Sequence, residues 1–258
     1  TTLCLNFMGH VLKSGAGVVF FSLEMPAEQI MMRMLADKTS IPLQEIMTAS
    51  LDDEKLAHFS HACSEFSHAK LFVHDSGYVN IHQVRTQLRK LKSAHPEISL
   101  CVIDYIGLMM STNNFADRHI QIAEISRGLK LLARELDMPI IALSQLNRGL
   151  EARANKRPML SDLRESGAIE QDADIILFVY RHEVYLEQEE NEKKSKAAAE
   201  GKEYKSEHVF NKLQENAEII VGKNRNGEVG SIDVLFQKQY SRFCDIATTP
   251  VQSTEFKE

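Results

Sequence analysis

The sequence predicts an α/β fold, with a mostly parallel sheet flanked by helices and ending in antiparallel hairpins. Short, uninterrupted apolar runs alternate along the chain with segments of helical periodicity, and this alternation is typical of parallel strands covered by helices. Near the C-terminal end, two strand-like runs are separated by Asn226-Gly227, a strong hairpin-turn signal because both residues tolerate positive φ. The 258 residues, 43% of them hydrophobic, suffice for one large domain.

Five apolar runs are predicted to be buried parallel strands. None of them alternates apolar with polar residues, so both faces of each strand are expected to be covered. They span residues 17–22, 71–74, 100–104, 140–144 and 175–179. Two further strands, 218–222 and 231–236, flank the Asn226-Gly227 turn and are expected to form an antiparallel hairpin.

Helices are predicted between these strands. Pro26 suits the first turn of one helix, and Asn80 suits the cap of another. The clearest helix contains isoleucine and leucine at intervals of three and four residues, which places them in one apolar stripe. The predicted helices span residues 26–35, 52–66, 80–92 and 119–136, and a further helical pattern begins at Thr1. Repetition of strand and helix predicts a doubly wound sheet.

A charged insertion is predicted at residues 187–216. This stretch is rich in Glu, Lys and Ala and has few large apolar residues, so it has little to contribute to a core. We expect it to be exposed, and to be part helix and part mobile loop.

Composition limits the classes of function that fit the chain. The net charge is −6 and the pI about 5.9, so contacts with nucleic acid must come from local loops and not from a basic surface. No apolar run is long enough to span a membrane, and the N-terminal residues do not resemble a signal peptide, so we expect a soluble, cytoplasmic protein. The four cysteines include no C-x-x-C pair, which argues against a disulfide framework.

Polar residues lie at the ends of three predicted strands, where open parallel sheets bind ligands. Asp104 ends one apolar run, as a Walker B acid that helps hold Mg²⁺ on a nucleotide does; many strands, however, end in Asp because a turn follows. Glu24 is either a general base that orients water or a solvated edge residue. Gln145 either senses a γ-phosphate or caps a helix. Their joint placement favours a nucleotide site.

The first residues of the chain have part of a phosphate-loop pattern. Such a loop reads G-x-x-x-x-G-K-[ST] and leads into a helix. Thr1 falls at the position of the final Ser/Thr and opens a helical pattern, but the glycines and the lysine do not occur in this sequence. We therefore expect the chain as written to bind ATP poorly.

Lys223 and Arg225 are two residues apart on a predicted strand, so both are expected to project from one face of the hairpin, near its tip. A guanidinium placed beside a transferring phosphate stabilises the transition state, and a neighbouring subunit can supply it. The alternative is an edge strand protected by positive charge.

The polar stretch 160–174 contains Arg164 and Gly167 and precedes an apolar run. A DNA phosphate can be held by an arginine and by exposed backbone N–H groups near a glycine. The alternative is an Asp-capped helix end followed by an ordinary loop.

Several of these motifs occur together in one family. The segments SLEM at 22–25, VIDYIGLM at 102–109, IALSQLNR at 141–148, DLRESGAIEQDAD at 162–174 and KNRNG at 223–227 resemble bacterial DnaB-type replicative helicases. The similarity extends from Thr1 to about Asp245, and LRESG and KNRNG are its specific parts. The resemblance implies a single RecA-like P-loop NTPase domain over residues 1–258, which hydrolyses ATP with Mg²⁺ between the subunits of a homohexameric ring.

The resemblance also implies roles for individual residues. Glu24 matches the catalytic base, and Asp104 matches the Walker B acid. Gln145 matches the residue that couples the γ-phosphate to DNA. The remaining ATP and Mg²⁺ residues implied are Thr1, whose hydroxyl would hold Mg²⁺ together with Asp104, its neighbour Thr2, and Arg33 near the nucleotide base.

The other implied residues act on DNA or on a neighbouring subunit. Lys223 and Arg225 match the trans-acting pair. Arg164, Glu165 and Gly167 match a loop that grips single-stranded DNA, in which Glu165 acts through its backbone or by orienting Arg164. Primase and a helicase loader are the partners expected of the full-length protein. The N-terminal domain that docks primase in this family does not occur in the sequence, and the charged insertion is longer than the family pattern.

Two alternatives belong to other classes. A RecA- or RadA-like recombination ATPase would pair strands instead of unwinding them, and the segment Asp-Leu-Arg-Glu-Ser-Gly argues against it. A catalytically inactive ring or loader-binding module would keep the fold and lose catalysis. The presence of Glu24, Asp104 and Arg225 argues against this second alternative.

Overall fold

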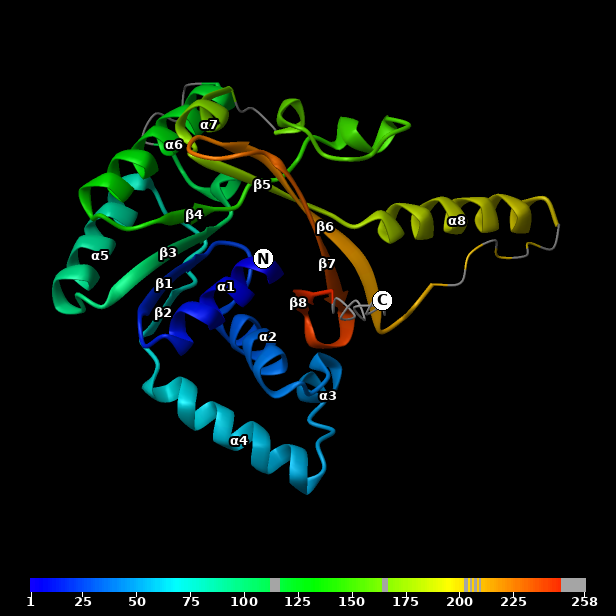
Figure 1. Ribbon diagram of the computed structural model, residues 1–258, viewed down its shortest axis with the longest axis horizontal. Coiled ribbons are helices and arrows are strands. Elements are labelled where there is room, and N and C mark those ends of the chain that lie inside the picture. Colours follow the sequence, from blue (N-terminus) through cyan, green and yellow to red (C-terminus); the bar gives the residue numbers. More distant parts are fainter. Residues whose placement is uncertain are drawn as a thin grey trace, which may run out of the picture.

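Two four-stranded sheets organise the described residues (Figure 1). The computed structural model describes residues 1–111, 117–163, 167–201, 204, 206, 208 and 210–246. The first sheet is entirely parallel and has the order β2 (Leu71–His74), β1 (Gly17–Ser22), β3 (Ile98–Asp104), β4 (Ile140–Ala142). Four of the five predicted strands are therefore confirmed as parallel, but the two edge strands, β2 and β4, are only partly buried and not fully covered as predicted.

Helices cover both faces of the parallel sheet, because the side chains of β1 alternate between two cores. Val19 and Phe21 pack with α5 (Ile81–Ala94) and α6 (Arg118–Glu135). Val18 and Phe20 pack with α1 (Thr2–Lys13) and α2 (Ala27–Thr39). All four side chains are buried, as expected for an uninterrupted apolar strand between two helical layers.

The predicted helices agree with the observed ones to within a few residues, and their caps explain where they begin. Pro26 immediately precedes α2. Asp52 caps α4 (Asp53–His68) by accepting a hydrogen bond from the backbone of Lys55 at 2.8 Å. Asn80 and Gln83 form a reciprocal capping box at the start of α5, with both bonds at 2.9 Å. None of the helices in the described ranges is both long and apolar enough to cross a membrane.

Short helical turns complete the connections between the main elements. They are α3 (Leu43–Met47), η1 (Ile106–Leu108), η2 (Arg148–Ala152), η3 (Leu160–Asp162), α7 (Gly167–Asp172) and η4 (Lys238–Tyr240). Of these, α7 packs against α6, and Ile169 reaches the core beneath it.

The second sheet is antiparallel and corrects one prediction. Its order is β5 (Ile175–Tyr180), β6 (Gln214–Asn224), β7 (Gly230–Gln237), β8 (Arg242–Asp245). The run 175–179 was predicted as a buried parallel strand; instead β5 pairs antiparallel with β6, and its residues alternate between exposed and buried. An apolar run carries no information about strand direction. The direction of β5 relative to its neighbour depends on the strand with which it pairs, which is β6.

The hairpin between β6 and β7 is confirmed, but its predicted turn conformation is wrong. Neither Asn226 nor Gly227 has a positive φ. The strands end at Asn224 and resume at Gly230, so the connection is longer than a two-residue turn. The side chain of Asn224 closes it instead, accepting from the backbone N–H of Asn226 at 3.3 Å.

The charged insertion is partly helical, as predicted, but its boundaries differ. Helix α8 (His182–Ala199) begins before residue 187, and residues 214–216 already belong to β6. Figure 1 shows α8 extending away from both sheets. The buried carboxylate of Glu215 anchors its base by pairing with Arg181 and with Lys238, whose Nζ lies 2.9 Å away. Part of the predicted mobile loop lies outside the described residues.

Gly128 lies where α6 meets α5, and it offers a test of the packing. A Cβ atom on Gly128 would lie 2.5 Å from Cγ1 of Ile81, which is buried. Overpacking of this kind costs typically about 1–3 kcal/mol, more than the roughly 1 kcal/mol by which a helix favours Ala over Gly. We therefore expect Gly128→Ala to lower the free energy of unfolding measured by chemical denaturation.

Gly9 is the matched control, because it is also in a helix. Its Cβ would meet only the carboxylate of Asp37, at 4.0 Å. Gly9→Ala is expected to raise the free energy of unfolding by about 0.5–1 kcal/mol. Equal effects of the two substitutions would contradict the close contact between α5 and α6.

Candidate nucleotide site

Three of the predicted site residues meet at the carboxyl ends of the parallel strands. Ser22 and Asp104 are partners in the register of β1 and β3, and the N–H of Leu23 donates to the carbonyl oxygen of Asp104 at 2.8 Å. Glu24 follows directly and is exposed at the same edge. Thr1, which precedes α1, donates its hydroxyl hydrogen bond to Oδ2 of Asp104. Residues far apart in the chain thus form one cluster.

This cluster fits the chemistry of a magnesium–nucleotide site. Asp104 is 4% exposed, whereas Glu24 is exposed, so one carboxylate is fixed and the other is accessible to water. Hydroxyl and carboxylate oxygens suit Mg²⁺, which commonly takes one or two protein ligands and completes its shell with phosphate oxygens and water. The described residues contain no group of three or more His, Cys, Asp or Glu that would hold a metal by itself. Thr1 and Asp104 supply the one or two oxygen ligands that a metal arriving with a nucleotide takes from a protein.

Cys4 lies one turn into α1, behind this cluster, and stays neutral. Burial raises the pKa of its thiol to about 11, so it remains protonated at neutral pH. The thiol of Cys4 therefore adds no negative charge near Asp104.

Arg33 and Thr2 are brought together by a residue that the sequence did not indicate. The guanidinium Nη1 of Arg33 donates to Oγ of Ser241 at 3.3 Å, and the hydroxyl oxygens of Thr2 and Ser241 are also 3.3 Å apart. Ser241 is buried, with φ of 53° between η4 and β8. It belongs to no motif, and β8 itself was not predicted, so the sequence held no signal for this contact.

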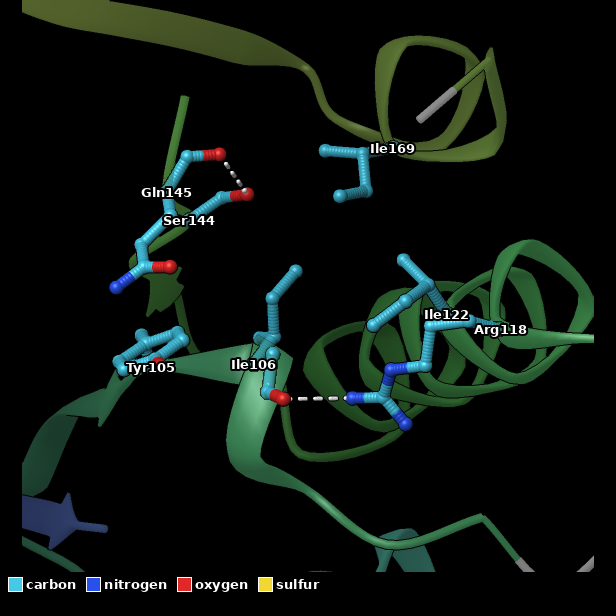
Figure 2. Close-up of a pocket in the computed structure, with 8 residues that line it drawn as sticks. Tyr105, Ile106, Arg118, Ile122, Ser144, Gln145 and Ile169 are labelled. Atoms are coloured by element: carbon cyan, nitrogen blue, oxygen red, sulfur yellow. Dashed lines mark hydrogen bonds between the residues drawn. The ribbon is translucent and has the colours of Figure 1, made fainter. Parts of the chain in front are cut away.

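Gln145 lies at the same edge of the sheet but lines a separate cavity. Hydrogen bonds continue past the end of β4, from the N–H of Leu143 to the carbonyl of Ile103 at 2.9 Å and from the N–H of Ile106 to the carbonyl of Leu143 at 3.0 Å. Figure 2 shows Gln145 and Ser144 on one side of this cavity, opposite α6 and α7. The cavity measures about 290 Å³ and is lined by Tyr105, Ile106, Gly107, Arg118, Ile122, Ser144, Gln145 and Ile169.

Arg118, at the first position of α6, is a second residue that sequence reasoning missed. Its Nη2 donates to the carbonyl of Gly107 at 2.7 Å, and its Nη1 donates to Oε1 of Gln121 at 2.7 Å. It therefore fixes the turn that follows Asp104 against α6. The predicted helix begins one residue later, at His119, so it does not include Arg118.

The predicted DNA-contacting loop is rooted beside Gln145. Arg164 and Glu165 lie outside the described residues, while Gly167 begins α7 and is exposed. Just before the loop, Leu163 forms an antiparallel bridge with Leu146, and the N–H of Asn147 donates to the carbonyl of Asp162 at 2.7 Å. The backbone of the residue after Gln145 is thus joined to the root of the loop.

Asp162 is held by its own neighbours. Both of its carboxylate oxygens accept from Arg153, at 3.0 and 2.8 Å, and Oδ2 also accepts from the N–H of Met159 at 2.9 Å. Asp162 is buried, so it fixes the start of the segment rather than meeting a ligand.

Lys223 and Arg225 contact α7 and not the cluster around Asp104. Nη1 of Arg225 donates to Oδ1 of Asp174 at 3.1 Å, and Nζ of Lys223 donates to the carbonyl of Glu170. In Figure 1 the tip of the β6–β7 hairpin lies by α7, away from the N-terminus. Within one chain, the two cations are therefore not brought to the predicted nucleotide site.

Comparisons with known proteins give one consistent family. Residues 1–245 match the family described as DnaB-like helicase C terminal domain. The replicative DNA helicase DnaB of Helicobacter pylori is 45% identical over 258 residues, which cover 95% of this chain and 53% of that protein. DnaB of Pasteurella multocida is 42% identical over 250 residues, which cover 96% of this chain and 49% of that protein. The chain thus spans about half the length of these curated relatives.

Solved structures give the same result. One solved structure is of a DnaB-like replicative helicase, described together with its interactions with primase. It matches this chain with a TM-score of 0.82 at 33% identity, and the match covers 95% of this chain and 54% of the helicase chain. A second solved structure, described as an ATPase domain, also matches with a TM-score of 0.82 at 33% identity. That match covers 95% of this chain and 80% of the ATPase-domain chain.

Proposed function

The chain belongs to the DnaB-like helicase C-terminal domain family, and from that premise we propose that it is the ATP-driven motor of a replicative DNA helicase. The sequence motifs that resemble this family all lie within residues 1–245, which match the family model. The observation that carries the proposal is the convergence of Thr1, Asp104 and Glu24 at one edge of the parallel sheet. It provides the hydroxyl, the buried acid and the exposed carboxylate that nucleotide hydrolysis needs.

In the proposed reaction each residue has a separate task. Thr1 and Asp104 would hold the Mg²⁺ that accompanies ATP, which would neutralise charge on the phosphates. Glu24, being exposed, accepts a hydrogen bond from the attacking water and aligns it. Arg33 is linked to Thr2 by Ser241, whose hydroxyl contacts both side chains. Its proposed task is to face the nucleotide base. Gln145 contacts the γ-phosphate when ATP is bound and loses this contact after hydrolysis. It thereby couples the bound nucleotide to the DNA-contacting loop, which begins beside Gln145.

The trans-acting pair supports assembly into a ring. Lys223 and Arg225 lie by α7 and away from the N-terminus of their own chain, so the ATP on which they are proposed to act is bound to a neighbouring subunit. Copies that each give a hairpin to one neighbour and receive one from the other form head-to-tail contacts, which make a ring when the rotation between copies closes. We propose a homohexamer, with primase and a loader as partners of the full-length protein.

The proposed substrate is single-stranded DNA, gripped by residues 164–167 of each subunit. Such a grip is mostly electrostatic, so the logarithm of its affinity falls linearly with log salt concentration. The net charge of −6 is compatible with this, since only the lining of a central channel needs local positive charge.

A forked-duplex assay tests the proposal against its alternatives. The natural full-length chain, with ATP and Mg²⁺, is expected to displace one strand of a fork and to hydrolyse ATP faster when single-stranded DNA is added. A nonhydrolysable ATP analogue is the control and is expected to support binding without unwinding. Strand exchange between homologous DNAs without unwinding would indicate a recombination ATPase, and DNA binding with neither activity would indicate an inactive module.

A further inference from the structure

Asp174 follows the C-terminal end of α7 and contacts cations from two other elements. Its Oδ1 accepts a hydrogen bond from Nη1 of Arg225 at 3.1 Å, and its Oδ2 accepts one from Nζ of Lys130 in α6. Its backbone carbonyl also accepts from the N–H of Arg225 at 2.8 Å. Asp174 thus joins the tip of the β6–β7 hairpin to α6.

The helix before Asp174 is fixed to α6 as well. Oγ of Ser126 donates to Oδ2 of Asp172 at 2.9 Å, and Nη1 of Arg127 lies 3.5 Å from Oδ1 of Asp172. The carbonyls at the end of α7 accept from the hairpin, including a bond from Nη2 of Arg225 to Gln171 at 3.3 Å. The terminal carbonyls and the partial negative charge of a helix C-terminus attract cations in this way.

We propose that Asp174 is a positioning residue, which holds the Arg225 guanidinium in place for the nucleotide of the neighbouring subunit and makes its position follow that of α7. The inference rests on the proposed function, in which Arg225 acts in trans. Arg225 is half-exposed at the hairpin tip, and fixing a long side chain costs conformational entropy. A carboxylate that fixes it beforehand leaves less of that cost to the transition state.

The charge and the position of Asp174 both suit this task. The hydrogen bond from Lys130, with the nearby charge of Arg225, holds the pKa of Asp174 below its ordinary value, so the carboxylate is ionised at neutral pH. Helix α7 begins at Gly167, which we assign to the DNA contact. Because α7 and Asp174 are both tied to α6, a shift of α7 together with α6 on binding DNA would carry Arg225 with it.

Asp174→Asn tests the positioning role, because it removes the charge and keeps the shape. In the natural full-length chain, we expect the kcat of DNA-stimulated ATP hydrolysis to fall about twofold to fivefold with the KM for ATP unchanged. Asp174→Glu is expected to retain more than half of the wild-type kcat. The matched control is Glu135→Gln, which breaks the exposed ion pair between Glu135, the last residue of α6, and Arg89 of α5 and is expected to leave kcat unchanged.

A double variant separates positioning from a merely structural role. On the residual rate of Arg225→Ala, adding Asp174→Asn is expected to cause no further loss, since Asp174 acts through Arg225. A further loss in that background, or a kcat of Asp174→Asn equal to or above wild type, overturns this inference alone. If Arg225→Ala itself retains full activity, the trans-acting assignment fails, and the positioning role of Asp174 fails with it.

Discussion

Replacing Glu24 with glutamine is expected to lower the DNA-stimulated rate of ATP hydrolysis by about 100-fold to 10 000-fold, the usual contribution of a general base. The carboxylate follows β1 and lies exposed beside the buried Asp104, where a water molecule can reach it. Glutamine keeps the size of the side chain but accepts a proton poorly. Because Glu24 acts on water and not on the phosphates, ATP binding is expected to remain.

Single-turnover hydrolysis and equilibrium binding of ATP measure the two effects separately. Glu28→Gln is the matched control, since Glu28 is an exposed acid in the first turn of the helix that follows. It is expected to hydrolyse ATP at the wild-type rate. A Glu24→Gln protein that keeps its hydrolysis rate would remove Glu24 from the chemistry and leave it as a solvated edge residue.

Replacing Arg225 with alanine is expected to lower kcat by about 1000-fold to 100 000-fold, the range for an arginine that stabilises a phosphoryl-transfer transition state. The KM for ATP is expected to change little, because the contact forms mainly in the transition state. Arg225 is suited to this because its exposed guanidinium lies at the tip of a hairpin.

The control for Arg225 is its neighbour in the same turn. Asn226→Ala changes an exposed residue of the hairpin tip without removing a cation, and steady-state kinetics should find it near the wild-type rate. If Arg225→Ala matched Asn226→Ala, the hairpin would be an edge protected by positive charge and nothing more.

The parallel half of the fold was predictable from the sequence, because burial on both faces leaves a clear pattern. Residues 17–22 are the clearest case: the predicted strand and β1 coincide, and every residue is buried. Strand direction leaves no such pattern, so β5 was placed in the wrong sheet. The short strand β8 was missed because Arg242–Asp245 offers only four residues, with charges at both ends.

The candidate site was predictable where it depends on strand ends. Asp104 and Glu24 follow apolar runs, and parallel strands bring such ends to one edge. Contacts that depend on tertiary packing left no signal, as for Ser241, which meets Thr2 and Arg33 from the far end of the chain. Asp174 was part of a quoted motif, but its contact with Arg225 depends on how the hairpin lies on α7.

The measurement that tests the shared site most directly is ATP hydrolysis by mixed subunits. Glu24→Gln and Arg225→Ala proteins, made in the natural full-length chain, are each expected to be inactive with single-stranded DNA. When subunits of the two are exchanged into common rings, some interfaces combine an intact Glu24 with an intact Arg225, and activity is expected to return. If the mixture stays as inactive as its parts while subunit exchange is verified, the nucleotide site is not shared between neighbours and the account of a ring-forming motor is contradicted.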